Sequence, residues 1–164
     1  MTSTRYGRGT VTRIVVGVDG SEPSSEALDW ALSLARITGA VVHVVQAWLA
    51  PVSYGYPDVT AFRGDVEHNL RLMVKRAEPA DLAVTVELVD GAAAHVLVEA
   101  SRDADLLVVG TRGYGGFTGL LLGSVSAQVV HHAACPVVVV PPTSVVEGRS
   151  PATERPAGLG HVHP

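Results

Sequence analysis

Short runs of β-branched residues alternate with stretches of helical periodicity, and this alternation limits the fold more than any other feature of the chain. Five such runs predict strands at Arg13–Asp19, Val41–Trp48, Leu82–Val89, Asp105–Gly110 and Pro136–Val140. The stretches between them predict helices at 21–39, 62–77, 94–102 and 124–133. Strands that are almost continuously apolar and separated by helices are typical of parallel sheets covered on both faces. The predicted fold is therefore an α/β protein with an open, doubly wound, five-stranded parallel sheet.

The bulk properties fit one folded domain and exclude several classes of function. We expect a domain over residues 11–141, with a flexible N-terminus at 1–10 and a flexible tail at 142–164, where periodicity is lost. A net charge of −4 argues against a nucleic-acid partner. No apolar run is long enough to span a bilayer, and the N-terminus lacks the pattern of a signal peptide. Because Cys135 is the only cysteine, we expect a cytoplasmic protein without disulfides.

A glycine-rich loop after the fourth predicted strand is the main candidate for binding chemistry. Five glycines fall between Gly110 and Gly119, and Gly123 and Ser124 then open the last helix. Glycine lets backbone N–H groups approach an anion, and a helix N-terminus favours phosphate. Ser124 and Ser126 add hydroxyl donors. The alternative is an ordinary turning surface loop, since glycine also marks loops without ligands.

The common phosphate and nucleophile motifs are missing. The chain has no G-x-x-x-x-G-K-[ST], and its only lysine, Lys75, lies within a predicted helix. The first turn reads Asp19-Gly20-Ser21 and lacks the G-x-G-x-x-G of dinucleotide folds. No G-x-S-x-G elbow occurs either.

Several polar residues have a structural interpretation beside a functional one. Asp19 either caps its turn or, at the carboxyl end of a strand, faces a ligand. His131 and His132 suit the negative end of the last helix dipole, which explains them better than catalysis does. His43, His68 and His95 have no partner at metal-ligand spacing, and His161 and His163 lie in the expected flexible tail, so no metal site is predicted on side chains. Cys135 is interpreted as a small buried hydrophobe.

Taken together, these segments resemble the universal stress protein family, of the ATP-binding kind. The family signature G-x2-G-x9-G-[ST] is intact as Gly110, Gly113, Gly123 and Ser124. The opening IVVGVDGS, the segment 91–110 and the segment 116–140 are also similar to the family. The resemblance covers about residues 11–141 and implies the fold of that family and of the adenine nucleotide α-hydrolases.

The resemblance implies a role for each matching residue. Asp19 would face adenosine, the Ala47 backbone would meet adenine, and Gly110 would pack beside ribose. Phosphates would be held by Gly113, Gly123, Ser124 and Ser126. The complete set of nucleotide-binding residues that it implies is Asp19, Ala47, Val109, Gly110, Thr111, Arg112, Gly113, Gly123, Ser124, Val125 and Ser126.

Arg112 is the only cation in the loop, whereas ATP carries about four negative charges. The resemblance implies a Mg²⁺ or Mn²⁺ ion bound through the phosphates, which relieves this mismatch. It also implies a homodimer through the strand 136–140.

The expected function is an ATP-binding universal stress protein, a nucleotide-dependent regulator with an unknown protein partner, no membrane partner and at most slow ATP hydrolysis or autophosphorylation. No general base or catalytic lysine accompanies the loop, so no catalytic residue is assigned. Two alternatives remain: a nucleotide α-hydrolase-type enzyme that activates a substrate with ATP, and a nucleotide-free dimeric scaffold.

Overall fold

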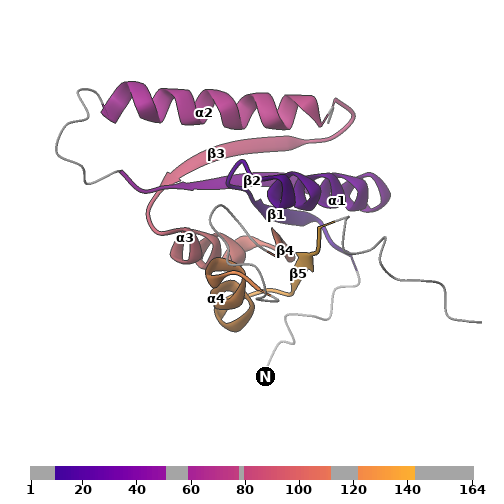
Figure 1. Cartoon of the computed structure of the whole chain (residues 1–164). Helices are drawn as coiled ribbons and strands as arrows, with labels where there is room; N and C mark the ends of the chain where they lie inside the picture. Colours follow the sequence, from indigo (N-terminus) through magenta and orange to yellow (C-terminus); the bar gives the residue numbers. More distant parts are fainter. Residues whose placement is uncertain (1–9, 51–58, 78–79, 112–121, 143–164) are drawn as a thin grey trace, which may run out of the picture.

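The computed structural model describes residues 10–50, 59–77, 80–111 and 122–142. Strands and helices alternate through this part of the chain (Figure 1). The strands are β1 (Arg13–Gly17), β2 (Val41–Trp48), β3 (Val84–Asp90), β4 (Leu106–Gly110) and β5 (Val137–Val140). The helices are α1 (Glu22–Thr38), α2 (Val59–Arg76), α3 (Ala93–Ala100), the short 3₁₀ helix η1 (Ser101–Asp103) and α4 (Ser124–His132).

The five strands form one parallel sheet in the order β3-β2-β1-β4-β5. Alternate residues of each strand face opposite sides, so Ile14 and Val16 pack with α1 and α2, whereas Val15 packs with α3 and α4. Figure 1 shows α2 on one side of the sheet and α3 and α4 on the other. The predicted doubly wound fold is confirmed, with β1 at its centre and β3 and β5 at its edges.

The strand and helix limits differ from the predicted ones by a few residues, for local reasons. The strand predicted to reach Asp19 ends at Gly17, because Asp19 enters a turn in which its Oδ1 accepts the Ser21 N–H at 3.0 Å. Ser21 does occupy the N-cap position of α1, but its side chain bonds Asp19 instead of capping the helix. At the other end Gly39 has φ +74°, and its N–H donates to the Ala35 carbonyl as an αL cap does.

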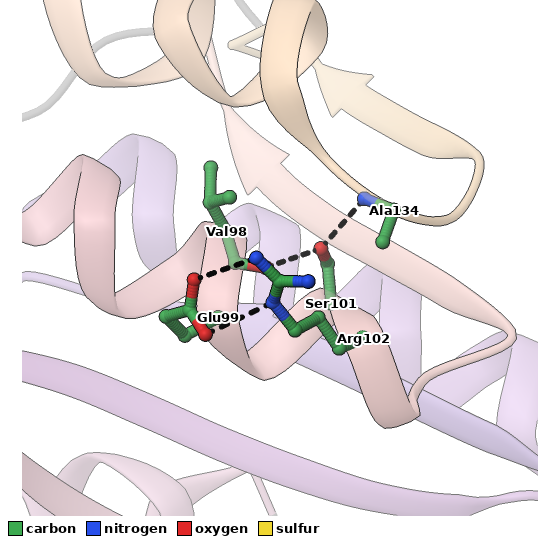
Figure 2. Close-up of polar contacts among 5 residues, drawn as sticks. All are labelled: Val98, Glu99, Ser101, Arg102 and Ala134. Carbon is green, nitrogen blue, oxygen red and sulfur yellow. Dashed lines mark hydrogen bonds and ion pairs between the residues drawn. The ribbon is translucent and has the colours of Figure 1, made fainter.

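Residues 94–102 were predicted as one helix, but α3 ends at Ala100 and continues as η1, with Ser101 at the junction (Figure 2). The Ser101 hydroxyl is fully buried, donates to the Val98 carbonyl at 2.6 Å and accepts the Ala134 N–H at 2.8 Å. One side chain therefore ties the end of α3 to the connection between α4 and β5. The neighbouring Arg102–Glu99 ion pair lies on the surface, where such pairs stabilise little.

The start of α2 is fixed to the ends of β2 and β3. The Phe62 ring stacks at an angle on Trp48, with centroids 5.4 Å apart, and Arg63 donates to the Leu88 carbonyl. Further along α2, Leu70 and Val74 pack in the core against the sheet. Among the described residues, no helix is long and apolar enough to cross a membrane.

Candidate functional site

The carboxyl ends of β1 and β4 lie side by side at the point where the chain changes direction across the sheet. From β1 the chain goes to α1 on one face, and from β4 it goes to α4 on the other. Open parallel sheets bind ligands in the crevice at this switch point. The predicted site residues come from the segments that leave these ends.

Asp19 follows β1 and forms part of the turn before α1. Its Oδ1 accepts hydrogen bonds from the Ser21 N–H and the Ser21 hydroxyl, which closes the turn before α1. Asp19 also lines a cavity that begins at this turn. A capping role and a place beside a candidate ligand site are therefore compatible.

Gly110 ends β4 and is required by packing. A Cβ at this position would lie 2.7 Å from the Pro23 carbonyl oxygen in the first turn of α1. A backbone atom cannot move aside as the end of a flexible side chain can, so glycine is what lets α1 start this close to β4. The resemblance implied ribose packing at Gly110; the contact that the structure shows is with α1.

Thr111, Gly123 and Ser126 bring the two ends of the loop together. The Thr111 carbonyl accepts the Gly123 N–H at 2.7 Å and lies 2.9 Å from the Ser126 hydroxyl, which also lies 3.0 Å from the Gly123 carbonyl. The Ser126 side chain, predicted to face phosphate, is buried in these contacts. By contrast, the Thr111 Oγ1 is buried and has no hydrogen-bond partner within the described part of the chain.

The first turn of α4 presents unused backbone donors at the same place. Gly123 is its N-cap, and the first helical bond runs from the Ala127 N–H to the Gly123 carbonyl. The N–H groups of the three residues between them, 124–126, therefore have no acceptor within the helix. No side chain caps this end among the described residues, and Ser124 is exposed. Free N–H groups and the positive end of the helix dipole make this turn suited to an anion.

Two further residues of the predicted site, Val109 and Val125, have side chains that pack in or against the core. Val109 is 4% exposed and packs in the core under α3 and α4, and Val125 packs against the same cluster. Their side chains are therefore part of the core and do not line a site. Arg112 and Gly113 lie outside the described residues.

Ala47 lies where its backbone can meet a ligand. The pairing of β1 with β2 ends at Gly17 and Val45, with a last bond of 3.0 Å from the Val18 N–H to the Val45 carbonyl. Ala47 is two residues further along β2, so its N–H and C=O point to the same side, past the end of β1. This gives one donor and one acceptor at the edge of the crevice.

A cavity of about 580 Å³ extends from Asp19 between α1 and α2, within the usual size of small-molecule sites. Gln46 lines it from β2 and was not predicted as a site residue. The signal in the sequence was a polar residue next to Ala47 in a strand whose other polar residue is His43. The lining residues are Asp19, Gly20, Ser25, Leu28, Asp29, Gln46, Val66, Asn69, Leu70, Leu72, Met73, Arg76 and Ala77.

Cys135 and His43, two further titratable residues, lie in the core and in the sheet. Burial, with the Asp105 charge as a second cause, raises the pKa of the Cys135 thiol, so the thiol stays protonated near neutral pH. His43 pairs with Glu87 at 3.0 Å across neighbouring strands. Within the described ranges, no three His, Cys, Asp or Glu side chains are grouped to hold a metal ion.

The fold and its switch-point crevice define an open, doubly wound α/β protein. The sequence profile of the universal stress protein family matches residues 10–141, and the chain belongs to that family. It is 37% identical to a universal stress protein of Mycobacterium tuberculosis in an alignment of 143 positions that covers 77% of this chain and 46% of that protein. It is also 31% identical to a universal stress protein of Methanocaldococcus jannaschii. That alignment has 145 positions and covers 83% of this chain and 85% of the relative. The chain thus spans about half the length of the mycobacterial relatives that it matches.

Solved structures share the fold. A universal stress protein in complex with cAMP superposes with a TM-score of 0.66 at 31% identity, over 82% of this chain and 99% of that one. A family member from Arabidopsis thaliana with AMP bound has a TM-score of 0.59 at 22% identity, over 86% of this chain and 97% of that one. The second likeness shows the common fold alone.

Proposed function

We propose that this chain binds ATP or a related adenine nucleotide in the crevice between β1 and β4, as a nucleotide-dependent regulator in a stress response. The observation that carries the proposal is the uncapped first turn of α4 beside the unpartnered hydroxyl of Thr111. Burying a hydroxyl without a partner costs about 1–3 kcal/mol, and a phosphate oxygen supplies the missing acceptor. The cAMP complex of a 31% identical family member supports an adenine nucleotide as the ligand.

The nucleotide then extends from α4 towards β2. Phosphates meet the free N–H groups at 124–126 and the Ser124 hydroxyl, ribose lies near Asp19, and adenine meets the backbone donor and acceptor of Ala47. Adenine offers a matching acceptor and donor at N1 and N6. An anion site on α4 and a partly apolar cavity beyond Asp19 together suit a molecule with a charged end and a flat apolar end.

A divalent ion fits this site only if the phosphates of the nucleotide coordinate it. The described residues contain no three-residue group of metal ligands, so phosphate oxygens and water would supply the coordination. A Mg²⁺ or Mn²⁺ ion bound in this way neutralises phosphate charge. The protein contributes N–H donors and hydroxyls.

Binding is favoured over turnover because the described residues around the crevice supply donors for an anion, and none of them is placed as a general base beside these donors. Asp19, the carboxylate that borders the crevice on β1, accepts hydrogen bonds from Ser21 in its own turn. We therefore propose a cytoplasmic regulatory protein, with slow hydrolysis or autophosphorylation at most. The same family resemblance leads us to propose a homodimer through the edge strand β5.

Isothermal titration of Mg·ATP into Gly123→Val tests the site. Gly123 has φ −73° and ψ 167°, an extended conformation that valine adopts, so the fold should persist while the branched side chain crowds the first turn of α4. The matched control is Gly64→Val, on an exposed position of α2 where an added Cβ meets nothing within 4 Å. We expect the first variant to lose ATP binding and the second to keep it. Equal affinity in both would contradict the proposed site.

A further inference from the structure

The Gln46 side chain lies in the cavity between α1 and α2 without a hydrogen-bond partner among the described residues. Its neighbours on the same face of β2, Val44 and Trp48, pack in the apolar core under these helices. Gln46 therefore projects from the same face, half-buried, between two apolar side chains. Its amide atoms are not buried from solvent, so a ligand in this cavity can reach them.

The surroundings of Gln46 suit a flat ring. Leu28 of α1 and Leu70 and Met73 of α2 supply apolar walls on either side of the cavity. The peptide groups of Ala47, the next residue, point past the end of β1 into the adjoining crevice. One backbone donor–acceptor pair and one side-chain amide thus come from successive residues at the same end of β2.

An adenine ring has two hydrogen-bonding edges that share the 6-amino group. The backbone of Ala47 matches N1 and one amino hydrogen. A glutamine amide matches the other amino hydrogen through its oxygen and N7 through its N–H₂, the pairing by which glutamine reads adenine in nucleic acids.

We propose that Gln46 selects the base of the bound nucleotide, by accepting from the adenine 6-amino group and donating to N7. The inference rests on the proposed function and adds a specificity-determining residue to it. A site built to hydrogen-bond a polar group rejects analogues that lack the group, because its own polar atoms are then left unpaired.

The test compares three ligands on nucleotide-free protein by isothermal titration. The ligands are ATP, purine riboside triphosphate, which lacks the 6-amino group, and 7-deaza-ATP, which lacks N7. Wild-type protein should bind ATP about tenfold more tightly than 7-deaza-ATP, since a bidentate pair contributes about 1–3 kcal/mol. Gln46→Leu, of similar volume, should bind ATP about tenfold more weakly than wild type and lose the preference over 7-deaza-ATP.

Two more variants separate base reading from packing. Gln46→Glu keeps the acceptor for the amino group but loses the donor to N7, so it should still prefer ATP over purine riboside triphosphate but not over 7-deaza-ATP. Thr85→Val makes a polar-to-apolar change on the neighbouring strand β3, at an exposed position, and should keep the wild-type pattern. An unchanged preference for ATP over 7-deaza-ATP in Gln46→Leu would overturn the inference and leave the proposed function intact. Failure of wild-type protein to bind any of the three ligands would instead overturn the proposed function.

Discussion

Ser101 shows at the scale of one residue how a buried hydroxyl holds two segments together. It accepts the Ala134 N–H at 2.8 Å while donating to the Val98 carbonyl, and it is fully buried. Ser101→Ala would leave the Ala134 N–H without an acceptor, so the free energy of unfolding should fall by about 1–3 kcal/mol. Urea denaturation measures this, with the exposed helical Ser33→Ala as control. A loss no larger than that of Ser33→Ala would contradict the role of Ser101.

Thr111 differs from Ser101, because its buried hydroxyl has no hydrogen-bond partner among the described residues. Thr111→Val removes the hydroxyl and keeps the shape. The free energy of unfolding without nucleotide should therefore stay the same or rise by about 1 kcal/mol. Affinity for Mg·ATP should fall about tenfold, because a phosphate contact is lost. Denaturation and titration of the same sample measure both, and a fall in stability without a fall in affinity would show that Thr111 is structural only.

At the scale of helices and strands, the close contact between Gly110 and Pro23 sets the position of α1 against β4. A Cβ on Gly110 would lie 2.7 Å from the Pro23 carbonyl, a backbone atom, whereas a Cβ on Gly17 would meet the end of the Leu97 side chain at 2.7 Å. Gly110→Ala must displace the first turn of α1, and Gly17→Ala need only move one rotamer. We expect Gly110→Ala to destabilise the protein by about 2–3 kcal/mol, and Gly17→Ala by less. Urea denaturation of both variants decides, and equal losses would contradict this explanation of Gly110.

The edge strand β5 carries the proposed dimer. Pro136 and Val140 accept from the N–H groups of Leu107 and Thr111, so the alternate residues Val137 and Val139 direct their peptide groups away from β4. Proline is tolerated on such an edge position and removes one outward donor. Val139→Pro should therefore remain folded but sediment as a monomer, whereas the wild type should sediment as a dimer at micromolar concentration. Dimeric Val139→Pro, or a monomeric wild type, would contradict dimerisation through this edge.

For the whole molecule, periodicity in the sequence was sufficient to predict the order of strands and helices and the parallel sheet. The reason is that each buried strand and each amphipathic helix carries its own local pattern. Contacts between distant residues left no such pattern. The close approach of Gly110 to Pro23 and the position of Gln46 in a cavity depend on how α1 and α2 pack on the sheet.

The location of the candidate site could be predicted from the sequence, but the roles of its individual side chains could not. The glycine signature located the carboxyl end of β4 and the first turn of α4. It did not distinguish residues that offer a side chain from those that offer backbone. Val109 and Val125 pack in the core, and the Ser126 hydroxyl bonds the ends of its own loop, because local packing takes up these side chains before any ligand binds.

If this crevice holds an adenine nucleotide, the purified protein should carry one. The most direct test is to denature the freshly purified protein and identify the released small molecules by chromatography and mass spectrometry. We predict close to one adenine nucleotide per chain, with ATP indicating binding without rapid turnover. Protein that releases no nucleotide and also fails to bind added Mg·ATP would contradict the claim.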